Sequence, residues 1–464
     1  MRSDCNFDRG RHSIRLINSR LDAETFRIGG SNKGEEKMSE FSSKNPYFGE
    51  MIEKRVITHP DSTKETRHIS FDLGSSGLEY KAGDALGIIP QNPSELVSDL
   101  IALLDFNNDD LVETHLGEST IEEALTHNYE VHRLCKKFIQ GLEMKFSSSA
   151  PKVSMRLVGR SRNQVSSGES LIDWDWSGEG DDFPSGFSPV GSATDPALML
   201  WESLVNNPDA MEDYIWSRDY IDLLADMPNL SFTPQEFVSN LDRLKPRLYS
   251  IASSPDAHPG LVELTVGIVR YNHHGRDRGG LCTIYMADEA SLNEKSIPMF
   301  MSPTRSFVLP ADGDTDIIMV GPGTGIAPFR AFLEQRECDK SKGRNWFFFG
   351  DRTSTHEYLY EDELKNWADS GHLTKLDLAW SRMADIPKTY VQDLMAQNGE
   401  EIWSWIDGGA YFYVCGDKNR MAKDVHKTLI KIVEDYGGLS TDEATHYVEK
   451  RMMKEEKRYL RDVY

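Results

Sequence analysis

The chain has 464 residues, and its 52 lysines and arginines against 75 aspartates and glutamates give a formal net charge of −23 at pH 7. A protein this acidic repels the backbone of nucleic acids, so no nucleic-acid partner is expected. The sequence contains no apolar run of about eighteen residues, so no membrane span is expected either. The length predicts more than one domain, each with its own core.

The first 44 residues are polar, rich in arginine, serine, asparagine and glycine, and show no periodicity. They lack the apolar segment of a secretory signal, so we expect residues 1–44 to be a disordered N-terminal extension. The five cysteines are widely scattered, and no pair has the spacing of a metal or iron–sulfur site. They are Cys5, Cys135, Cys282, Cys338 and Cys415. This usage predicts a reducing, cytoplasmic location and no metal centre.

The first half of the chain carries a β pattern. Residues 47–90 alternate apolar and polar positions and are interrupted by turns at 59–61 and 74–77. Such alternation predicts antiparallel strands of a barrel or a sandwich. Further strands are expected at 247–252, 261–271 and 305–309.

Helical periodicity separates these two sets of strands. It is present over residues 93–104, 119–143 and 195–225, which predicts a helical insertion at about 93–240. Within it, residues 146–192 are rich in serine, glycine and aspartate and poor in aliphatic side chains. We expect this stretch to be a flexible insertion.

From residue 315 the pattern changes to alternating strands and helices. The predicted strands are 316–320, 345–350, 375–379 and 410–415, and the predicted helices are 328–335, 361–370, 391–397 and 421–436. This alternation predicts a mostly parallel sheet. The predicted fold class is therefore β followed by α/β, with a barrel and its helical insertion over 45–310 and an α/β domain over 311–464.

Residues 247–255 read Arg-Leu-Tyr-Ser-Ile-Ala-Ser-Ser-Pro. A flavin dinucleotide needs a flat ring to stack on, a cation for its pyrophosphate and short donors for the ring edge. Tyr249, Arg247 and Ser250 supply these three parts. The alternative is an ordinary strand, with Tyr249 in the core and Arg247 at the surface.

Glycines follow the strand at 316–320 directly, in Gly321-Pro322-Gly323-Thr324-Gly325-Ile326-Ala327-Pro328. Glycines allow a backbone to approach a pyrophosphate, and Pro328 suits the first turn of a helix whose N-terminus attracts anions. The segment is therefore a candidate dinucleotide-binding loop. A tight turn without a ligand is the alternative.

Three further motifs are weaker alone. Residues 279–283, Gly-Gly-Leu-Cys-Thr, would place small residues ahead of a helix and so hold a second pyrophosphate. Ser381, Arg382, Lys388 and Tyr390 would grip a 2′-phosphate and stack on its adenine, which selects NADPH over NADH. The alternatives are a plain turn and a solvated loop. Cys415 ends a buried strand, where ligand contacts gather in open α/β sheets, although a buried cysteine is usually only a small apolar residue.

In this order the motifs resemble those of the ferredoxin–NADP reductase superfamily. They are RLYSIASSP, VELTVGIVRY, GPGTGIAPFRAFLEQR, FFFGDR, YLYEDEL, the pair SR…KTYVQ, YVCGD and the final RDVY. The helical insertion is similar to that of the diflavin-reductase branch, which includes NADPH–haemoprotein reductases and the flavoprotein subunit of sulfite reductase. Of the members named here, the motifs resemble most the flavoprotein subunit of sulfite reductase. The resemblance covers about residues 45–464, apart from 146–192.

The resemblance implies a role for each matching residue. FAD would be bound by Arg247, Tyr249, Ser250, Gly280, Leu281, Cys282 and Thr283, with Tyr464 on the opposite face of the flavin from Tyr249. NADPH would be bound by Gly321, Gly323, Thr324, Gly325, Ser381, Arg382, Lys388, Tyr390 and Gln392. The catalytic set around the contact between nicotinamide and flavin would be Ser250, Cys415, Asp462 and Tyr464.

The resemblance also implies an FAD-dependent NADPH oxidoreductase that passes single electrons to a separate acceptor. The acceptor would be a flavodoxin or other FMN protein, a ferredoxin, or a sulfite reductase haemoprotein. The favoured interpretation is the flavoprotein component of assimilatory sulfite reductase. The alternatives are a stand-alone NADPH–flavodoxin, ferredoxin or haemoprotein reductase and a flavin-binding scaffold without activity.

The chain departs from the family pattern in three places. Val308 stands where relatives have an arginine, which removes a basic contact and puts cofactor affinity in doubt. Ser381 and Lys388 are one residue further apart than in relatives. Nothing before residue 45 would form a flavodoxin-like FMN domain, so the chain is expected to represent the FAD/NADPH half alone.

Overall fold

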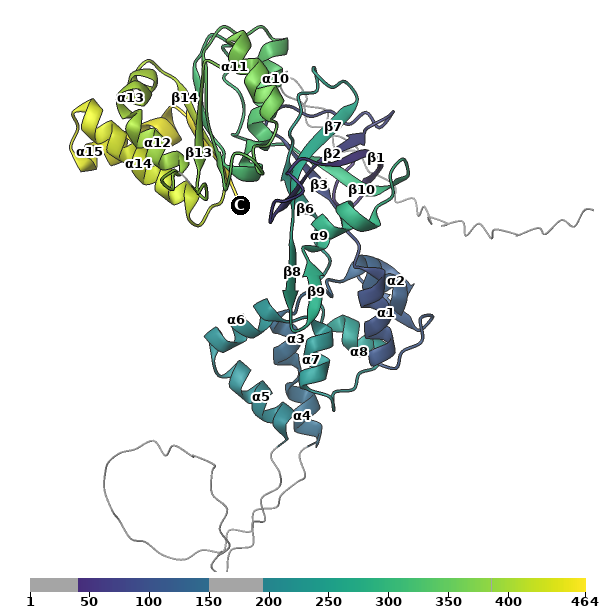
Figure 1. The fold of residues 1–464 in the computed structure, drawn as a ribbon. Coiled ribbons are helices and arrows are strands. Elements are labelled where there is room, and N and C mark those ends of the chain that lie inside the picture. The colour runs from purple at the N-terminus through teal and green to yellow at the C-terminus, as the bar shows by residue number, and fades with distance from the viewer. Residues whose placement is uncertain (1–40, 150–194, 385) are drawn as a thin grey trace, which may run out of the picture. The chain divides into compact units, whose positions relative to one another are not determined.

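The computed structural model describes residues 41–149, 195–384 and 386–464. Its first sheet has six antiparallel strands in the order β6-β3-β10-β1-β2-β7 (Figure 1). The strands are β1 Tyr47–Val56, β2 Glu65–Asp72, β3 Ala85–Ile88, β6 Arg247–Ser250, β7 Leu261–Ile268 and β10 Lys295–Ser302. An antiparallel bridge between Ile251 and Leu264 joins the two outer strands. The predicted antiparallel barrel is thereby confirmed.

Both faces of β7 are buried, for different reasons. Val262, Leu264 and Val266 alternate along the strand and pack inside the barrel, as the period of two in a strand requires. Glu263 and Thr265 point the other way and are also buried. Glu263 accepts a hydrogen bond from Arg330 and Thr265 is hydrogen-bonded to Tyr360, both in the α/β domain. Strand β7 therefore forms part of the interface between the barrel and that domain.

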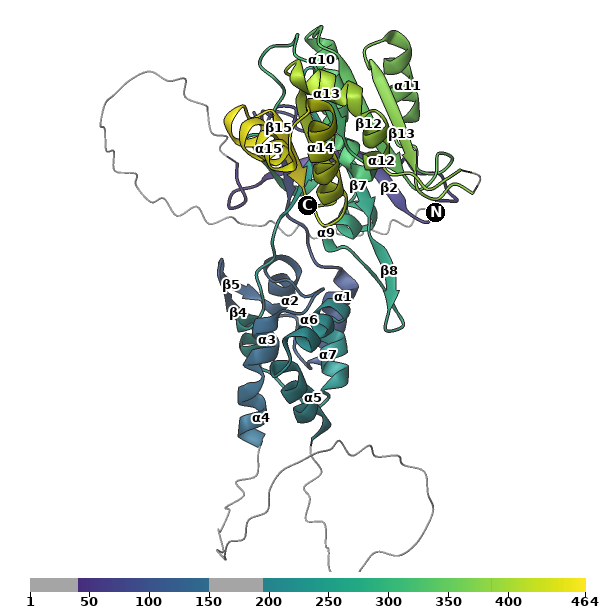
Figure 2. The same cartoon turned by 90° about the vertical axis from the view of Figure 1, so that its left-hand side faces the viewer.

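A helical insertion lies between β3 and β6 and has a core of its own. Its helices are α1 Ser94–Leu103, α2 Ile121–Glu123, α3 Lys136–Gly141, α4 Glu143–Ser149, α5 Pro196–Val205, α6 Pro208–Ser217, α7 Tyr220–Asp226 and α8 Pro234–Ser239, with a π-helical turn, η1, at Ala124–Asn128 and a hairpin of β4 Leu111–Thr114 and β5 Gly117–Thr120. Figure 2 shows most of these elements gathered together. The helical pattern predicted over 119–143 is interrupted because Tyr129 forms a β-bridge with Arg243. Most of the predicted flexible insertion lies outside the described residues, and its residues 146–149 belong to α4.

The prediction of a strand at residues 305–309 is wrong. The last barrel strand is β10, Lys295–Ser302, and residues 305–309 connect the two sheets without strand structure. Phe307 is buried because it packs against Phe329, Phe332 and Tyr413 of the second domain. Apolar residues in the connecting segment therefore reflect burial by a neighbouring domain and not pairing within the barrel.

The second sheet has five parallel strands in the order β13-β12-β11-β14-β15. They are β11 Ile317–Val320, β12 Asn345–Asp351, β13 Lys375–Trp380, β14 Tyr411–Gly416 and β15 Tyr459–Val463. The helices are α10 Ala327–Cys338, α11 Glu361–Ser370, α12 Val391–Gln397, α13 Gly399–Asp407, α14 Met421–Gly437 and α15 Thr441–His446, with a 3₁₀ turn, η3, at Gly323–Ile326 and a π-helical segment, η4, at Tyr447–Glu455. The predicted parallel α/β fold is confirmed.

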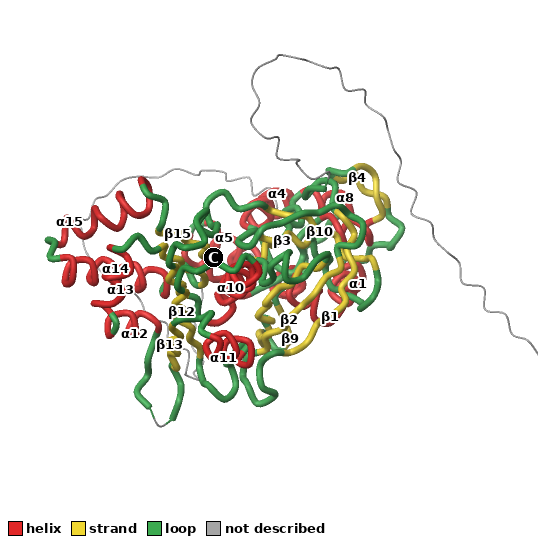
Figure 3. The backbone as a smooth tube through the Cα atoms, turned by 90° about the horizontal axis from the view of Figure 1, so that it is seen from above, coloured by secondary structure: helices red, strands yellow, loops and turns green. Residues whose placement is uncertain are grey.

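Helices cover both faces of this sheet (Figure 3). Ile317 and Met319 of β11 pack on the side of α10 and α11, whereas Ile318 and Val320 pack on the side of α12, α13 and α14. A strand buried on both faces reads as a continuous apolar run, which is why β11 was recognisable in the sequence. Within the described parts of the chain, no helix is both long and apolar enough to cross a membrane.

Candidate functional site

A cavity of about 440 Å³ lies where four parallel strands end. The carboxyl ends of β11, β12, β13 and β14 meet at one edge of the sheet, which is the position of ligand sites in open α/β folds. Its lining residues are Lys64, Pro322, Gly323, Gly350, Asp351, Ala379, Ser381, Thr389, Tyr390, Val391, Gln392, Asp417, Arg420, Met421 and Asp424.

The glycine loop after β11 forms one wall of this cavity. Gly323 has a positive φ of 58°, a conformation that glycine adopts without strain. A Cβ atom at Gly325 would lie 2.3 Å from the carbonyl oxygen of Cys415, so only glycine lets the loop lie against the end of β14. The loop then continues through η3 into α10, with Pro328 in the first turn of the helix. Such a loop fits a dinucleotide pyrophosphate.

The predicted 2′-phosphate residues lie around the same cavity, but not all of them line it. The backbone N–H and the hydroxyl of Ser381 donate to the carbonyl oxygen of Asp351, at 3.0 and 3.2 Å. Tyr390 and Gln392 line the cavity, whereas Arg382 and Lys388 are exposed beside it. The Lys388 ammonium lies 5.0 Å from the centre of the Tyr390 ring.

On the barrel side, Arg247 at the start of β6 is held by an ion pair. Its guanidinium lies 2.5 Å from a carboxylate oxygen of Glu130, in the helical insertion, and also donates to the carbonyl of Lys245 at 2.7 Å. Two residues along β6, Tyr249 is half-buried. Burial and the neighbouring Cys282 thiol raise the pKa of its hydroxyl, so Tyr249 stays protonated.

Residues 280–283 lie at the start of α9, Leu281–Ile284, as predicted for the second glycine motif. Gly280 is the residue before the helix, and no side chain caps this end. The Thr283 hydroxyl donates to the carbonyl of Gly280 at 2.9 Å, while Leu281 and Cys282 are buried. Burial raises the pKa of the Cys282 thiol to about 12. The uncapped amides are the feature that fits an FAD pyrophosphate.

Ser250, Cys415 and Asp462 come together from three strands. The Ser250 hydroxyl at the end of β6 donates to a carboxylate oxygen of Asp462 on β15, at 2.5 Å. The buried Cys415 thiol lies 3.9 Å from the same oxygen, and Cys415 and Asp462 are paired in the register of β14 and β15. Burial raises the pKa of the Cys415 thiol, and the Asp462 carboxylate raises it further. The thiol is therefore a neutral donor to Asp462 at pH 7.

Tyr464, the last residue, connects this trio with the glycine loop. Its N–H donates to the carbonyl of Gly416 at 3.2 Å, and its own carbonyl accepts from the N–H of Lys418 at 3.0 Å. Its hydroxyl lies 3.1 Å from the Thr324 hydroxyl. The side chain remains largely solvent-accessible, since Tyr464 is 62% exposed.

Two protein families match the two halves of the chain. The FAD binding domain family matches residues 39–146 and 202–285, and the Oxidoreductase NAD-binding domain family matches residues 319–427. These ranges contain every barrel strand except β10, most of the helical insertion, and the glycine loop with strands β12, β13 and β14 of the parallel sheet. The chain therefore matches the two domain families expected from the resemblance to the ferredoxin–NADP reductase superfamily.

Curated relatives of this reductase superfamily are similar along nearly the whole chain. The sulfite reductase [NADPH] flavoprotein alpha-component of Bacillus subtilis is 36% identical over 92% of this chain. Those of Mannheimia succiniciproducens and Vibrio vulnificus are 34% and 35% identical over 91%. The chain spans 62% of the length of the first two and 60% of the third. The matches confirm the predicted oxidoreductase class with FAD and a nicotinamide nucleotide as cofactors, and the names of the relatives give that nucleotide as NADPH.

The structure adds residues to the candidate site that the sequence did not indicate. Lys64 comes from the turn between β1 and β2, and its ammonium pairs with the Asp351 carboxylate in the cavity wall. Asp351 is the last residue of the buried strand β12, within the FFFGDR motif, so its position at the sheet edge was predictable. No signal in the sequence places a lysine of the barrel beside it.

At Val308, the side chain is 40% exposed and the carbonyl accepts a 2.7 Å hydrogen bond from Tyr413.

Proposed function

We propose that this chain is the part of a sulfite reductase flavoprotein that takes a hydride from NADPH onto FAD and passes single electrons to a separate haemoprotein or flavin carrier. The oxidoreductase and FAD-binding families support the first step, and the names of the similar proteins support the choice of acceptor. Hydride transfer and single-electron release are the chemistry that the two cofactors supply when bound.

The observation that carries this proposal is the Ser250–Asp462 hydrogen bond. It joins the end of a barrel strand to the last strand of the parallel sheet, so the predicted FAD side and the predicted NADPH side meet at one pair of residues. Ser250, Asp462 and the neutral Cys415 thiol provide a hydrogen-bonded group that would orient a nicotinamide ring for transfer.

The remaining predicted residues have roles on either side of this pair. Tyr249 would stack on one face of the flavin and Tyr464 on the other, from which Tyr464 must move when the nicotinamide arrives. Arg247 and the start of α9 would hold the FAD pyrophosphate, and the loop from Gly321 to Gly325 would hold that of NADPH. Ser381, Arg382, Lys388, Tyr390 and Gln392 would hold the 2′-phosphoadenosine end.

Two measurements test the proposal. Mixing the purified protein with NADPH in the absence of oxygen should bleach the flavin absorbance, whereas NADH should do so much more slowly. The reduced protein should then reduce a sulfite reductase haemoprotein. If the flavin is not bleached by NADPH, the chain is no reductase; if only a flavodoxin or a ferredoxin is reduced, the sulfite assignment is wrong.

A further inference from the structure

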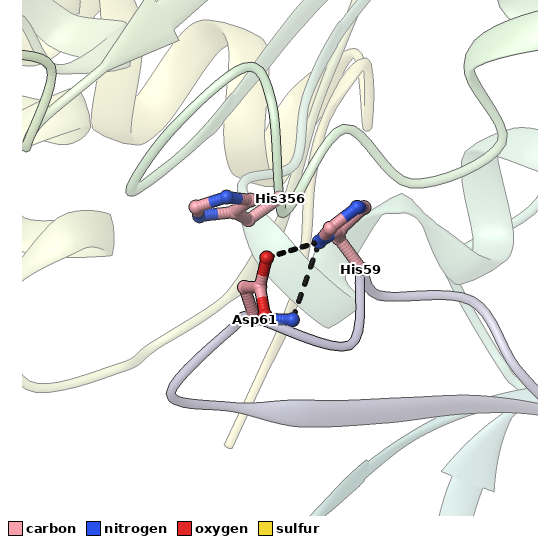
Figure 4. Close-up of side chains that lie close together, drawn as sticks. All are labelled: His59, Asp61 and His356. Atoms are coloured by element: carbon pink, nitrogen blue, oxygen red, sulfur yellow. Dashed lines mark hydrogen bonds and ion pairs between the residues drawn. The ribbon is translucent and has the colours of Figure 1, made fainter.

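Two histidines and an aspartate lie side by side at a contact between the barrel and the parallel sheet (Figure 4). His59 and Asp61 belong to the turn between β1 and β2, and His356 belongs to the loop between β12 and α11. One ligand-type atom from each side chain lies within 4.8 Å of the other two. The two imidazole rings are stacked, with centroids 5.1 Å apart, and Nδ1 of His59 lies 3.6 Å from the Asp61 carboxylate.

The backbone holds these side chains near one another without help from a ligand. The N–H of His59 donates to the carbonyl of His356 at 2.9 Å. Nearby, the Ser62 hydroxyl donates to the Glu357 carboxylate at 2.6 Å. The turn and the loop are therefore docked on each other, and a ligand that used all three side chains would not have to bring the two segments together.

The chemistry of the three side chains suits a divalent transition metal. Two imidazole nitrogens and one carboxylate oxygen form a common protein ligand set for zinc, with water in the remaining position. In a tetrahedral zinc site, ligand atoms at bond lengths of about 2.1 Å lie roughly 3.4 Å apart. His59 and Asp61 are exposed, so small side-chain rotations are sufficient to bring their atoms from within 4.8 Å to that spacing.

The surroundings of the cluster are open and acidic. His59 and His356 line a cavity of about 520 Å³, and Glu361, Asp362 and Glu363 line the same cavity. These three carboxylates occupy the first turn of α11. Glu361 pairs with Lys365 at 2.6 Å and Glu363 with Arg330 at 2.6 Å, so Asp362 carries the acidic charge that attracts cations, and the open cavity leaves room for water ligands. Arg55 also lines the cavity, but its guanidinium is paired with Glu53 at 2.8 Å.

Among the described residues, a second group of side chains could also hold a metal, but an arginine already occupies it. The group consists of His258, Glu263 and Glu334. The guanidinium of Arg330 already lies 2.7 Å from Glu263 and 2.9 Å from Glu334, and so it neutralises both carboxylates. At His59, Asp61 and His356 no such internal cation is recorded among the described residues.

We propose that His59, Asp61 and His356 form a binding site for one divalent transition-metal ion of the zinc class, which links the β1–β2 turn to the loop before α11. The spacing of the cysteines gave no sign of this site, because its ligands are imidazoles and a carboxylate from two distant segments. The site is separate from the nucleotide cavity and from the Ser250–Asp462 pair, so it goes beyond the proposed function.

Zinc titration of the full-length, tag-free flavoprotein by isothermal calorimetry tests the site. We expect one zinc ion to bind, and we expect His59→Asn and His356→Asn each to weaken that binding by about tenfold or more. His426→Asn is the matched control, because His426 is a histidine outside the cluster that pairs with Glu449 at 3.1 Å. Flavin content, measured for every variant, reports that each protein is folded.

Two further readouts distinguish this site from zinc bound elsewhere. Cobalt, added in place of zinc, should give the intense visible absorption of a tetrahedral site in the wild type and in His426→Asn, but not in His356→Asn. Zinc should also raise the unfolding temperature of the wild type and not that of His356→Asn, since an ion bound only to the folded state stabilises it. If His59→Asn and His356→Asn bind zinc as tightly as the control variant, the proposal is wrong.

Discussion

Ser250 on barrel strand β6 donates a 2.5 Å hydrogen bond to Asp462 on β15, the last strand of the parallel sheet. The acceptor is a carboxylate that also lies 3.9 Å from the Cys415 thiol. A hydrogen bond to a charged group contributes ~1.5–3 kcal/mol, more than a neutral one. The pair therefore both ties the two domains together at this point and fixes the position of the polar groups that would meet the nicotinamide.

Ser250→Ala should mainly slow hydride transfer. Loss of ~1.5–3 kcal/mol from the transition state corresponds to about one to two orders of magnitude in rate. The measurement is the rate of flavin bleaching after rapid mixing with NADPH, together with the concentration dependence that gives the affinity. An unchanged bleaching rate with weaker NADPH binding would show that Ser250 only helps to bind the nucleotide.

Deletion of Tyr464 should slow the release of the nicotinamide nucleotide and relax discrimination against NADH. In the structure its hydroxyl is hydrogen-bonded to Thr324, and its ring is the predicted competitor of the nicotinamide for the flavin face. The measurements are kcat/KM for both nucleotides and the dissociation rate of NADP⁺. Tyr464→Phe is the control: it keeps the ring and loses only an exposed hydrogen bond of ~1 kcal/mol, so its effect should not exceed about fivefold. Equal kinetics for the deletion and the wild type would refute the gating role.

The helices and strands that could be predicted are those whose burial gives the sequence a regular pattern of apolar residues. β11 is buried on both faces and reads Ile-Ile-Met-Val, and the boundaries of α11 and α12 were predicted to the residue. The strand expected at 305–309 failed because Phe307 is buried by another domain. The edge strand β15 was not predicted. It becomes a strand by pairing with β14, about forty residues earlier in the chain, and that contact leaves no local pattern.

The residues of the candidate site also differ in whether the sequence predicts that they lie together. Motifs that follow a buried parallel strand, such as those around Gly323 and Cys415, are brought to one edge by topology alone, so their meeting was expected. Lys64 and His356 reach their positions through docking of the β1–β2 turn on the sheet, which no local pattern specifies. The functional roles of the predicted site residues remain predictions that the variants here test.

Glu263 makes the stability of the contact between barrel and sheet dependent on pH. Burial alone would raise its pKa, but the His68 imidazole, whose Nε2 lies 3.7 Å from the carboxylate, and the charges of Arg330 and His258 hold the pKa at about 2. Because this value lies below the ordinary 4.5, its contribution is complete above pH 4.5 and is lost as the pH falls toward 2. The hydrogen bond that the His258 ring donates to the Glu334 carboxylate raises the pKa of His258, so the His258 contribution is complete below pH 6.5 and is lost as the pH rises through the raised value.

Glu263→Gln should therefore lower the unfolding temperature at pH 7, and the difference from the wild type should narrow as the pH falls from 4.5 toward 2. Thermal unfolding followed by circular dichroism at several pH values measures this. Glu361→Gln is a suitable control, because the Glu361 side chain is 44% exposed and, among the described residues, its carboxylate forms an ion pair with Lys365 alone. A difference between Glu263→Gln and the wild type that does not change with pH would contradict the low pKa of Glu263.

Lys64→Ala should raise KM for NADPH while leaving the bleaching rate at saturating NADPH nearly unchanged. The ammonium of Lys64 neutralises Asp351, whose side chain is only 5% exposed in the wall of the nucleotide cavity. Without the lysine, an uncompensated and nearly buried negative charge would face the phosphates of a nucleotide bound in this cavity. A penalty of ~1–2 kcal/mol corresponds to about a five- to thirtyfold weaker affinity.

The double variant Lys64→Ala/Asp351→Asn separates this electrostatic cause from a loss of packing. Removal of the aspartate charge should restore much of the affinity lost in Lys64→Ala, because the uncompensated carboxylate is then gone; a purely structural role would give additive losses instead. Lys431→Ala, which removes an exposed ammonium paired with Asp435 on α14, should leave KM unchanged. Since salt screens exposed charges more than buried ones, the effect of Lys64→Ala should persist at high ionic strength.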